Sequence, residues 1–407
     1  RGSPRATRVF EQLYSIGDAR PDLVGLRNQA LSCSIQDWQA EDARRRVHRE
    51  AAEQSVKEEN QTEFAKHKNA IRSGGDLGWL RWIADVYFNA KNGSPYERLV
   101  DALGEENASA AIDGLIAVLR RDDLPAFDEV VQIASKGQYF QWWYAIIAGL
   151  DEKWNQGIDL ASVNERLLES ALAIDLLHPT SYRDANSIKQ IERGWKSAAF
   201  KARASLALDV YLKIARMKLE QKREHVDGLH ELLNNEAFAP YRREMTVQLL
   251  RDYPNASSFR LGQLLESAIA IADAHGDLVS FARKVLDGSV AVDSNNHDMW
   301  LATAYLVSPE EFSSAVRIRA TDQPGLVWLL RDFAGYDHGN PTKDALPLNI
   351  AQLKDIAQMT AQNFPNCSHP PSAWWGDQNA WDGSDFVRGL INQISASPSE
   401  EATTALA

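Results

Sequence analysis

Cysteine and long apolar runs are scarce in this sequence. Its 407 residues include only two cysteines, Cys33 and Cys367, which lie near opposite ends of the chain. Two cysteines cannot form the disulfide framework of a small secreted domain, and they suit a reducing compartment. No run of about 18 apolar residues occurs, so the sequence predicts no membrane-spanning helix. We therefore expect a cytoplasmic protein with no membrane partner.

The motifs that usually carry chemistry are missing as well. The glycine-rich stretch SGGDLGWL at 73–80 lacks the Lys-Ser/Thr pair of a phosphate-binding loop, and we interpret it as a turn before an aromatic helix. Neither a Gly-x-Ser-x-Gly elbow nor a His-Glu-x-x-His pair occurs. His225 and His230 are close in sequence, but their spacing places them on different helix faces. The sequence predicts no catalytic residue, cofactor or metal site, and we expect that this segment is not an enzyme.

Positive charge is in deficit. The formal net charge is −12 and the pI is about 5.3. Lysine and arginine are needed to displace counterions from nucleic acid and to approach an anionic lipid surface. The charge balance therefore disfavours non-specific nucleic-acid binding and membrane-surface binding.

Strand signals are few, whereas helical spacing of apolar residues recurs along the chain. In residues 261–288 this spacing stops at 275–277 and then resumes, which predicts two antiparallel helices with Gly276 capping the first. Similar patterns predict helix pairs over 95–103 with 107–121, joined at Gly104, and over 125–136 with 138–150, joined at Gly137, together with single helices over 163–177 and 196–222.

These helix pairs predict an all-α fold in which antiparallel repeats form an α-solenoid of the HEAT or TPR kind. LLRDYPNA at 249–256 is echoed by LLRDFAGY at 329–336, an offset of about two HEAT-like periods. Two unrelated helix ends would give the same echo. The expected organisation is a polar helical linker over 1–70, a repeat array over 71–345 and a helical cap over 346–407. Both ends of the sequence read as cut edges of a longer protein.

Residues 39–70 are mostly charged or polar, with Val47, Val56 and Phe64 about a helical stripe apart. A helix this polar gains little from burial and depends on ion pairs along its surface. We interpret it as a solvated linker helix. A lever that joins this segment to an upstream domain is the alternative.

The stretch PNCSHPPSAWWGDQNAWDGSDF at 365–386 allows several interpretations. Cys367 and His369 could bind zinc, but one Cys-x-His falls short of a four-ligand site. Asp377 and Asp382 among tryptophans could serve a glycosidase, which makes an all-α, (α/α)-barrel-like hydrolase the alternative function. We favour a proline-stiffened connector in which Asp382 or Ser384 caps the next helix. Tryptophan is enriched at interfaces, so the candidate partner-binding residues are Trp374, Trp375, Trp381, Trp142 and Trp143.

Two further stretches are APYRREMTVQLLRDYPNASSFRLGQLL at 239–265 and HPPSAWWGDQNAWDGSDFVRGLINQISASPSEEATTAL at 369–406, together about a sixth of the chain. They resemble helical elements of large bacterial NACHT-type (STAND) NTPases. The resemblance implies antiphage or stress-sensing proteins, in which helical repeats detect a trigger and release an attached NTPase and effector. Because this segment lacks the phosphate-binding loop, the resemblance does not imply ATP hydrolysis here, and it identifies no catalytic residue. We therefore expect a non-catalytic sensor or scaffold that binds a protein partner or a neighbouring domain of the same chain.

Overall fold

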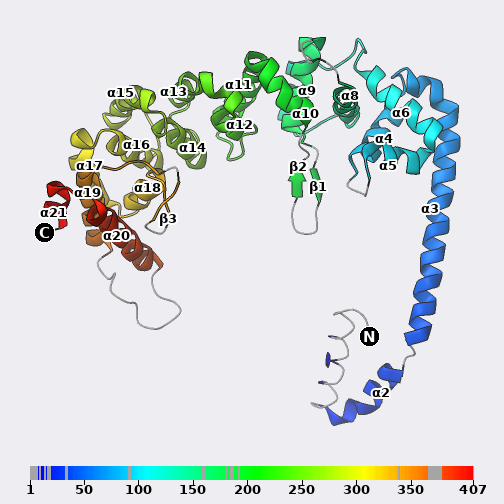
Figure 1. Cartoon of the computed structure of the whole chain (residues 1–407), viewed down its shortest axis with the longest axis horizontal. Coiled ribbons are helices and arrows are strands. Elements are labelled where there is room, and N and C mark those ends of the chain that lie inside the picture. Colours follow the sequence, from blue (N-terminus) through cyan, green and yellow to red (C-terminus); the bar gives the residue numbers. More distant parts are fainter. Residues whose placement is uncertain are drawn as a thin grey trace. The chain divides into compact units, whose positions relative to one another are not determined.

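A computed structural model gives the fold of this chain (Figure 1). It describes residues 8, 11–12, 15, 20–32, 35–89, 93–157, 159, 162–179, 181–183, 188–190, 193–337, 340–343, 345–364 and 378–406; within these, the side chains of 30–32, 35–40, 181–183, 188–190 and 378–381 are not described. The described part is mostly helical. Strands there are confined to two short antiparallel hairpins, so the predicted all-α class is confirmed.

The chain forms two compact units. Unit 1 comprises Arg1–Asp122 and Gln141–Glu152, and unit 2 comprises Asp123–Phe140 and Lys153–Ala407. These units are defined by contacts within the chain, and the three-part division expected from the sequence, 1–70, 71–345 and 346–407, stays a prediction.

Unit 1 is built around one long helix. Its elements are η1 (Pro21–Leu23), α2 (Val24–Ser32), α3 (Ile35–Arg72), α4 (Leu77–Phe88), α5 (Pro95–Leu103), α6 (Glu105–Val118) and the larger part of α8 (Trp143–Asn155). Only the second half of α3 packs against α4, α5 and α6, and there Phe64 and Ile71 are fully buried. Val47 and Val56, in the first half, are 65% and 55% exposed. Of the three apolar residues noted at helical spacing, only Phe64 therefore lies in the core, and the exposure of the two valines fits a solvated first half of the helix.

Unit 2 contains the remaining helices. They are α7 (Phe127–Ser135), α9 (Glu165–Leu177), α10 (Gly194–Ala202), α11 (Ala204–Glu220), α12 (Leu229–Asn234), η3 (Glu236–Tyr241), α13 (Arg242–Asp252), α14 (Ser258–Ile269), η4 (Ala272–Ala274), α15 (His275–Leu286), α16 (Ser294–Val307), α17 (Pro309–Asp322), α18 (Leu326–Phe333), α19 (Ile350–Asn363), α20 (Gln378–Ala396) and α21 (Glu400–Leu406). The strands are β1 (Ser181–Arg183) with β2 (Ile188–Gln190) and β3 (Tyr336–Asp337) with β4 (Asn340–Pro341).

Helices of unit 2 pack mainly against helices near them in the chain. Thus α14 contacts α13, α15, α16 and α18, and α19 contacts α17, α18, α20 and α21. In Figure 1, α11, α13 and α15 lie along one side of this unit, and α12, α14 and α18 lie along the other. Each helix shares its apolar side with its neighbours, so the core of the unit runs from helix to helix.

Several predicted elements are confirmed. α5 and α6 meet at Gly104, whose φ of +79° suits glycine. α9 ends at Leu177, just before His178-Pro179, as predicted. α4 follows the glycine-rich turn at 73–76, and the Asp76 side chain accepts a hydrogen bond from Trp79 N at its start.

Several predicted boundaries are wrong. The helix expected over 138–150 is α8, which spans Trp143–Asn155. Gly276 lies inside α15, because α14 already ends at Ile269 and a 3-10 turn follows it. The expected helix over 196–222 is broken at Arg203, whose ψ of 45° separates α10 from α11. Neither Asp382 nor Ser384 caps a helix, since α20 begins earlier, at Gln378.

Candidate functional site

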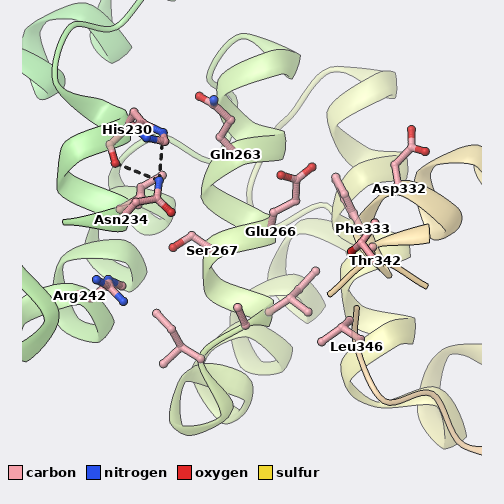
Figure 2. A pocket seen from close by; sticks show the side chains of 15 residues that line it. His230, Asn234, Arg242, Gln263, Glu266, Ser267, Asp332, Phe333, Thr342 and Leu346 are labelled. Atoms are coloured by element: carbon pink, nitrogen blue, oxygen red, sulfur yellow. Dashed lines mark hydrogen bonds between the residues drawn. The ribbon is translucent and has the colours of Figure 1, made fainter. Parts of the chain in front are cut away.

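A groove in unit 2 brings together side chains from several helices. It has a volume of about 580 Å³ and opens to solvent. Residues of α12, α13, α14 and α18 and of the segment after α18 line it, and we call it the α14 groove (Figure 2). Its lining residues are His230, Leu233, Asn234, Arg242, Gln263, Glu266, Ser267, Ile269, Ala270, Ile271, Asp332, Phe333, Gly335, Thr342 and Leu346.

Helix α14 forms the floor of the groove because it is amphipathic. Leu261, Leu264, Leu265 and Ala268 are buried on one side of the helix. Gln263, Glu266, Ser267 and Ala270 follow a spacing of three and four residues, which places them together on the other side. The apolar side anchors α14 in the core, so its polar side is held toward the groove.

The wall on the α18 side is acidic. Glu266 from α14 and Asp332 from the end of α18 both line the groove, and Figure 2 shows them on neighbouring helices. Asp332 accepts a hydrogen bond from Arg331 Nε at 2.9 Å, whereas the side chain of Glu266 makes no hydrogen bond or ion pair within the described part of the chain. Partial loss of hydration raises the pKa of Glu266, and the charge of Asp332 raises it further.

The opposite wall carries cationic and amide groups. His230 and Asn234 from α12 bond to each other, with Nδ1 and Nδ2 3.1 Å apart. Arg242, at the start of α13, donates from Nη2 to the carbonyl oxygen of Asn235 at 3.2 Å. Its Nε is shielded from solvent and has no hydrogen-bond partner. Buried donors are normally paired, so this guanidinium retains an unused donor beside the groove.

Apolar side chains complete the groove: Leu233, Ile269, Ile271, Phe333 and Leu346. The lining therefore combines an apolar contact surface with a few charged groups, as in binding pockets of this size. Among the lining residues, the Ser267 and Thr342 hydroxyls are not hydrogen-bonded to a neighbouring base. Across the described residues, no group of three or more His, Cys, Asp or Glu side chains could hold a metal ion.

The residues singled out from the sequence lie elsewhere. Trp374 and Trp375 fall outside the described residues, and Trp381 lies in α20 with its side chain outside them. Trp143 is 2% exposed and packs in the core of unit 1, and Trp142 beside it is half-buried. A buried ring cannot contact a partner, so Trp143 serves packing here.

Most residues of the zinc and glycosidase sites considered for the Trp-rich stretch lie outside the described residues. Cys367, His369 and Asp377 lie outside the described residues, and Asp382 lies within α20. Sequence reasoning missed Glu266, Asp332 and Arg242. One signal was present: Glu266 is the only acidic residue of the otherwise apolar or neutral run over 261–271.

No protein-family model, curated protein or solved structure is similar enough to this chain to count as a match. Within its described residues, no helix is long and apolar enough to cross a membrane.

Proposed function

We propose that this chain is a non-catalytic helical-repeat scaffold or sensor of the α-solenoid kind. It binds a protein partner or a neighbouring domain and thereby regulates an attached NTPase or effector. The observation that carries the proposal is the packing of unit 2, in which each helix contacts mainly its neighbours in the chain. Solenoids are built from such local contacts, and they present long binding surfaces.

The α14 groove supports the proposal because its walls come from different helices of unit 2. Five α-helices and two 3-10 helices separate α12 from α18 in the chain, and both α12 and α18 contribute side chains to the same groove. A small change in the packing of successive helices would alter the groove, and a ligand that prefers one arrangement would shift the population toward it. Binding at the groove is thereby coupled to the way in which the helices of unit 2 pack on one another.

Small-angle scattering of the chain in solution tests the array. We expect a maximum dimension and a distance distribution typical of an elongated helical superhelix. A globular profile, with a radius of gyration near that of a compact domain of this length, would contradict the proposal. The resemblance to NACHT-type NTPases is tested separately by the flanking gene sequence, where we expect a phosphate-binding Gly-Lys-Ser/Thr loop upstream.

A second candidate function, an all-α hydrolase, is favoured by one observation. Glu266 and Asp332 bring two carboxylates from two helices into one groove, and the raised pKa of Glu266 suits a general acid. A panel of glycoside and ester substrates separates the two functions. Turnover that is lost in Glu266→Gln but kept in Glu244→Gln, an exposed residue of α13 outside the groove lining, would establish the enzyme and reject the scaffold.

A further inference from the structure

The two walls of the α14 groove carry charges of opposite sign. Glu266 and Asp332 line the α18 side, while Arg242 and the titratable His230 line the α12 side (Figure 2). No ion pair joins the walls within the described part of the chain. The nearest carboxylate oxygen to Arg242 belongs to Glu236, 3.8 Å from Nη2, and the Glu236 side chain is 90% exposed. The groove therefore keeps its charges separate.

Each wall also has unused hydrogen-bonding capacity. The Glu266 side chain has no hydrogen-bond or ion-pair partner within the described part of the chain, and partial loss of hydration together with the charge of Asp332 disfavours its charged form. Arg242 Nε is shielded from solvent and makes no hydrogen bond. A buried donor left unpaired, such as Arg242 Nε, costs free energy, whereas the exposed carboxylate of Glu266 is hydrated and can exchange that water for a cationic group of a ligand.

We propose that the α14 groove binds a short segment of a partner protein that carries a basic side chain and an acidic group a few residues apart. The basic side chain lies against Glu266 and Asp332, and the acidic group lies against Arg242. This inference rests on the proposed function and names the chemistry of its partner.

Two features favour a peptide over a single small zwitterion. The volume of about 580 Å³ is well above that of one amino acid, and the groove is open, so a continuous chain can enter and leave it. Apolar side chains between the charged walls, among them Ile269, Phe333 and Leu346, offer contact area to the residues between the two charges. Charge-assisted hydrogen bonds at both ends then fix the register of the segment.

Four pools of capped hexapeptides test the proposal by calorimetric titration against the full chain. In each peptide, two variable positions are separated by one to four Ala or Leu residues. The four pools hold at these positions Lys and Asp, Lys and Asn, Gln and Asp, or Gln and Asn, and each pool contains both orders of its pair. We expect the Lys–Asp pool to bind about tenfold more tightly than either singly charged pool. Equal affinity across the four pools would overturn the proposal.

Groove variants assign the charges. In Glu266→Gln combined with Asp332→Asn, we expect the advantage of Lys over Gln to vanish while the advantage of Asp over Asn remains. Arg242→Gln should do the reverse, and Arg242→Lys, which keeps the charge, guards against a folding defect in that variant. Glu244→Gln should change neither advantage. A lysine advantage that survives in the double variant would overturn the proposal.

The outcomes also separate this inference from the proposed function. Free lysine binding as tightly as the Lys–Asp pool would replace the peptide with a small ligand and overturn the inference. If no pool binds but scattering shows an elongated particle, the inference fails and the scaffold stands. If scattering shows a globular particle and the chain has hydrolase activity, both the scaffold function and the peptide-binding site are rejected.

Discussion

The Tyr305 hydroxyl of α16 donates a hydrogen bond to Oδ2 of Asp355 in α19 at 3.2 Å. Arg317 of α17 donates from Nε to the other oxygen of the same carboxylate at 2.5 Å. One buried carboxylate thus connects α16, α17 and α19. Burial, together with the charge of Asp355, raises the pKa of Tyr305 far above its ordinary value, so the phenol stays a donor throughout the accessible pH range.

Substitution of Tyr305 and substitution of Asp355 should both destabilise unit 2, and the loss should be larger for Asp355. Tyr305→Phe deletes the donor but leaves Arg317 on Asp355, so we expect a loss of about 1 kcal/mol in the free energy of unfolding. Asp355→Ala leaves a buried hydroxyl without an acceptor and should cost about 2–4 kcal/mol. Urea unfolding measures both. Asp322→Ala, an exposed change on α17, is the control and should stay within about 0.5 kcal/mol of the parent.

Gly114 of α6 allows the end of α3 to approach closely. A Cβ added at Gly114 would lie 2.4 Å from the carbonyl oxygen of Ile71, which is backbone and cannot rotate away. Although alanine has the higher helix propensity, we expect Gly114→Ala to cost about 2–3 kcal/mol because the two helices must separate. Thermal unfolding followed by circular dichroism measures the change.

Gly276 provides the matched control, since it is also helical and nothing lies within 4 Å of a Cβ built there. Gly276→Ala should stabilise the protein by up to about 1 kcal/mol through helix propensity alone. If both glycine variants were stabilised, α3 would not pack on α6 as described.

These two glycines show how far the sequence could predict the fold. Gly276 interrupts an apolar pattern and was predicted to cap a helix, but the helix ends earlier, at Ile269, where the pattern is still apolar. The break at Arg203 is not marked by a glycine or proline in the sequence. Helical spacing predicts that helices form, whereas their ends depend on contacts distant in sequence.

The groove was harder to predict than the helices. Glu266 and Asp332 are far apart in sequence, and each looks like an ordinary polar residue on an amphipathic helix. Only the packing of α14 against α18 brings them to one cavity. The LLRD echo at 249–252 and 329–332 predicts a repeat, but Arg251 binds Asp277 and Arg331 binds Asp332, so the two copies make different contacts.

Glu266 predicts a pH dependence whose sign is fixed by the direction of its pKa shift. Because its pKa is raised on folding, the folded state binds more protons than the unfolded state, and this group lowers stability as pH rises from its unfolded pKa through its folded pKa. Glu266→Gln removes the effect. The variant should gain stability over the parent at pH 7 and lose that gain near pH 4.

The gain is expected to be small, because the Glu266 side chain keeps part of its hydration in the open groove. Urea unfolding at pH 4, 5, 6 and 7 measures it, with Glu244→Gln as a comparison that should give no trend. A gain that grows toward acid pH would reverse the sign and would show that Glu266 has a cationic partner in solution.

The first half of α3 should open independently of the rest of unit 1. Residues 41–56 make hydrogen bonds and ion pairs only within the helix, such as Arg45 with Glu41 at 2.5 Å, and such exposed pairs contribute about 0.3–0.5 kcal/mol each. From Lys57 onward, contacts with α5 and α6 begin, and Phe64 and Ile71 are fully buried. Hydrogen exchange should therefore be at least about tenfold faster over 41–56 than over 64–72.

High salt sharpens this last test. At 1 M salt the intrahelical pairs are screened, so exchange over 41–56 should accelerate further while exchange over 64–72 changes little. Buried apolar contacts hold the second region, and salt does not weaken them. Equal protection along the whole of α3 would mean that another surface covers Val47 and Val56 in solution, and the interpretation of this half as a solvated helix would be wrong.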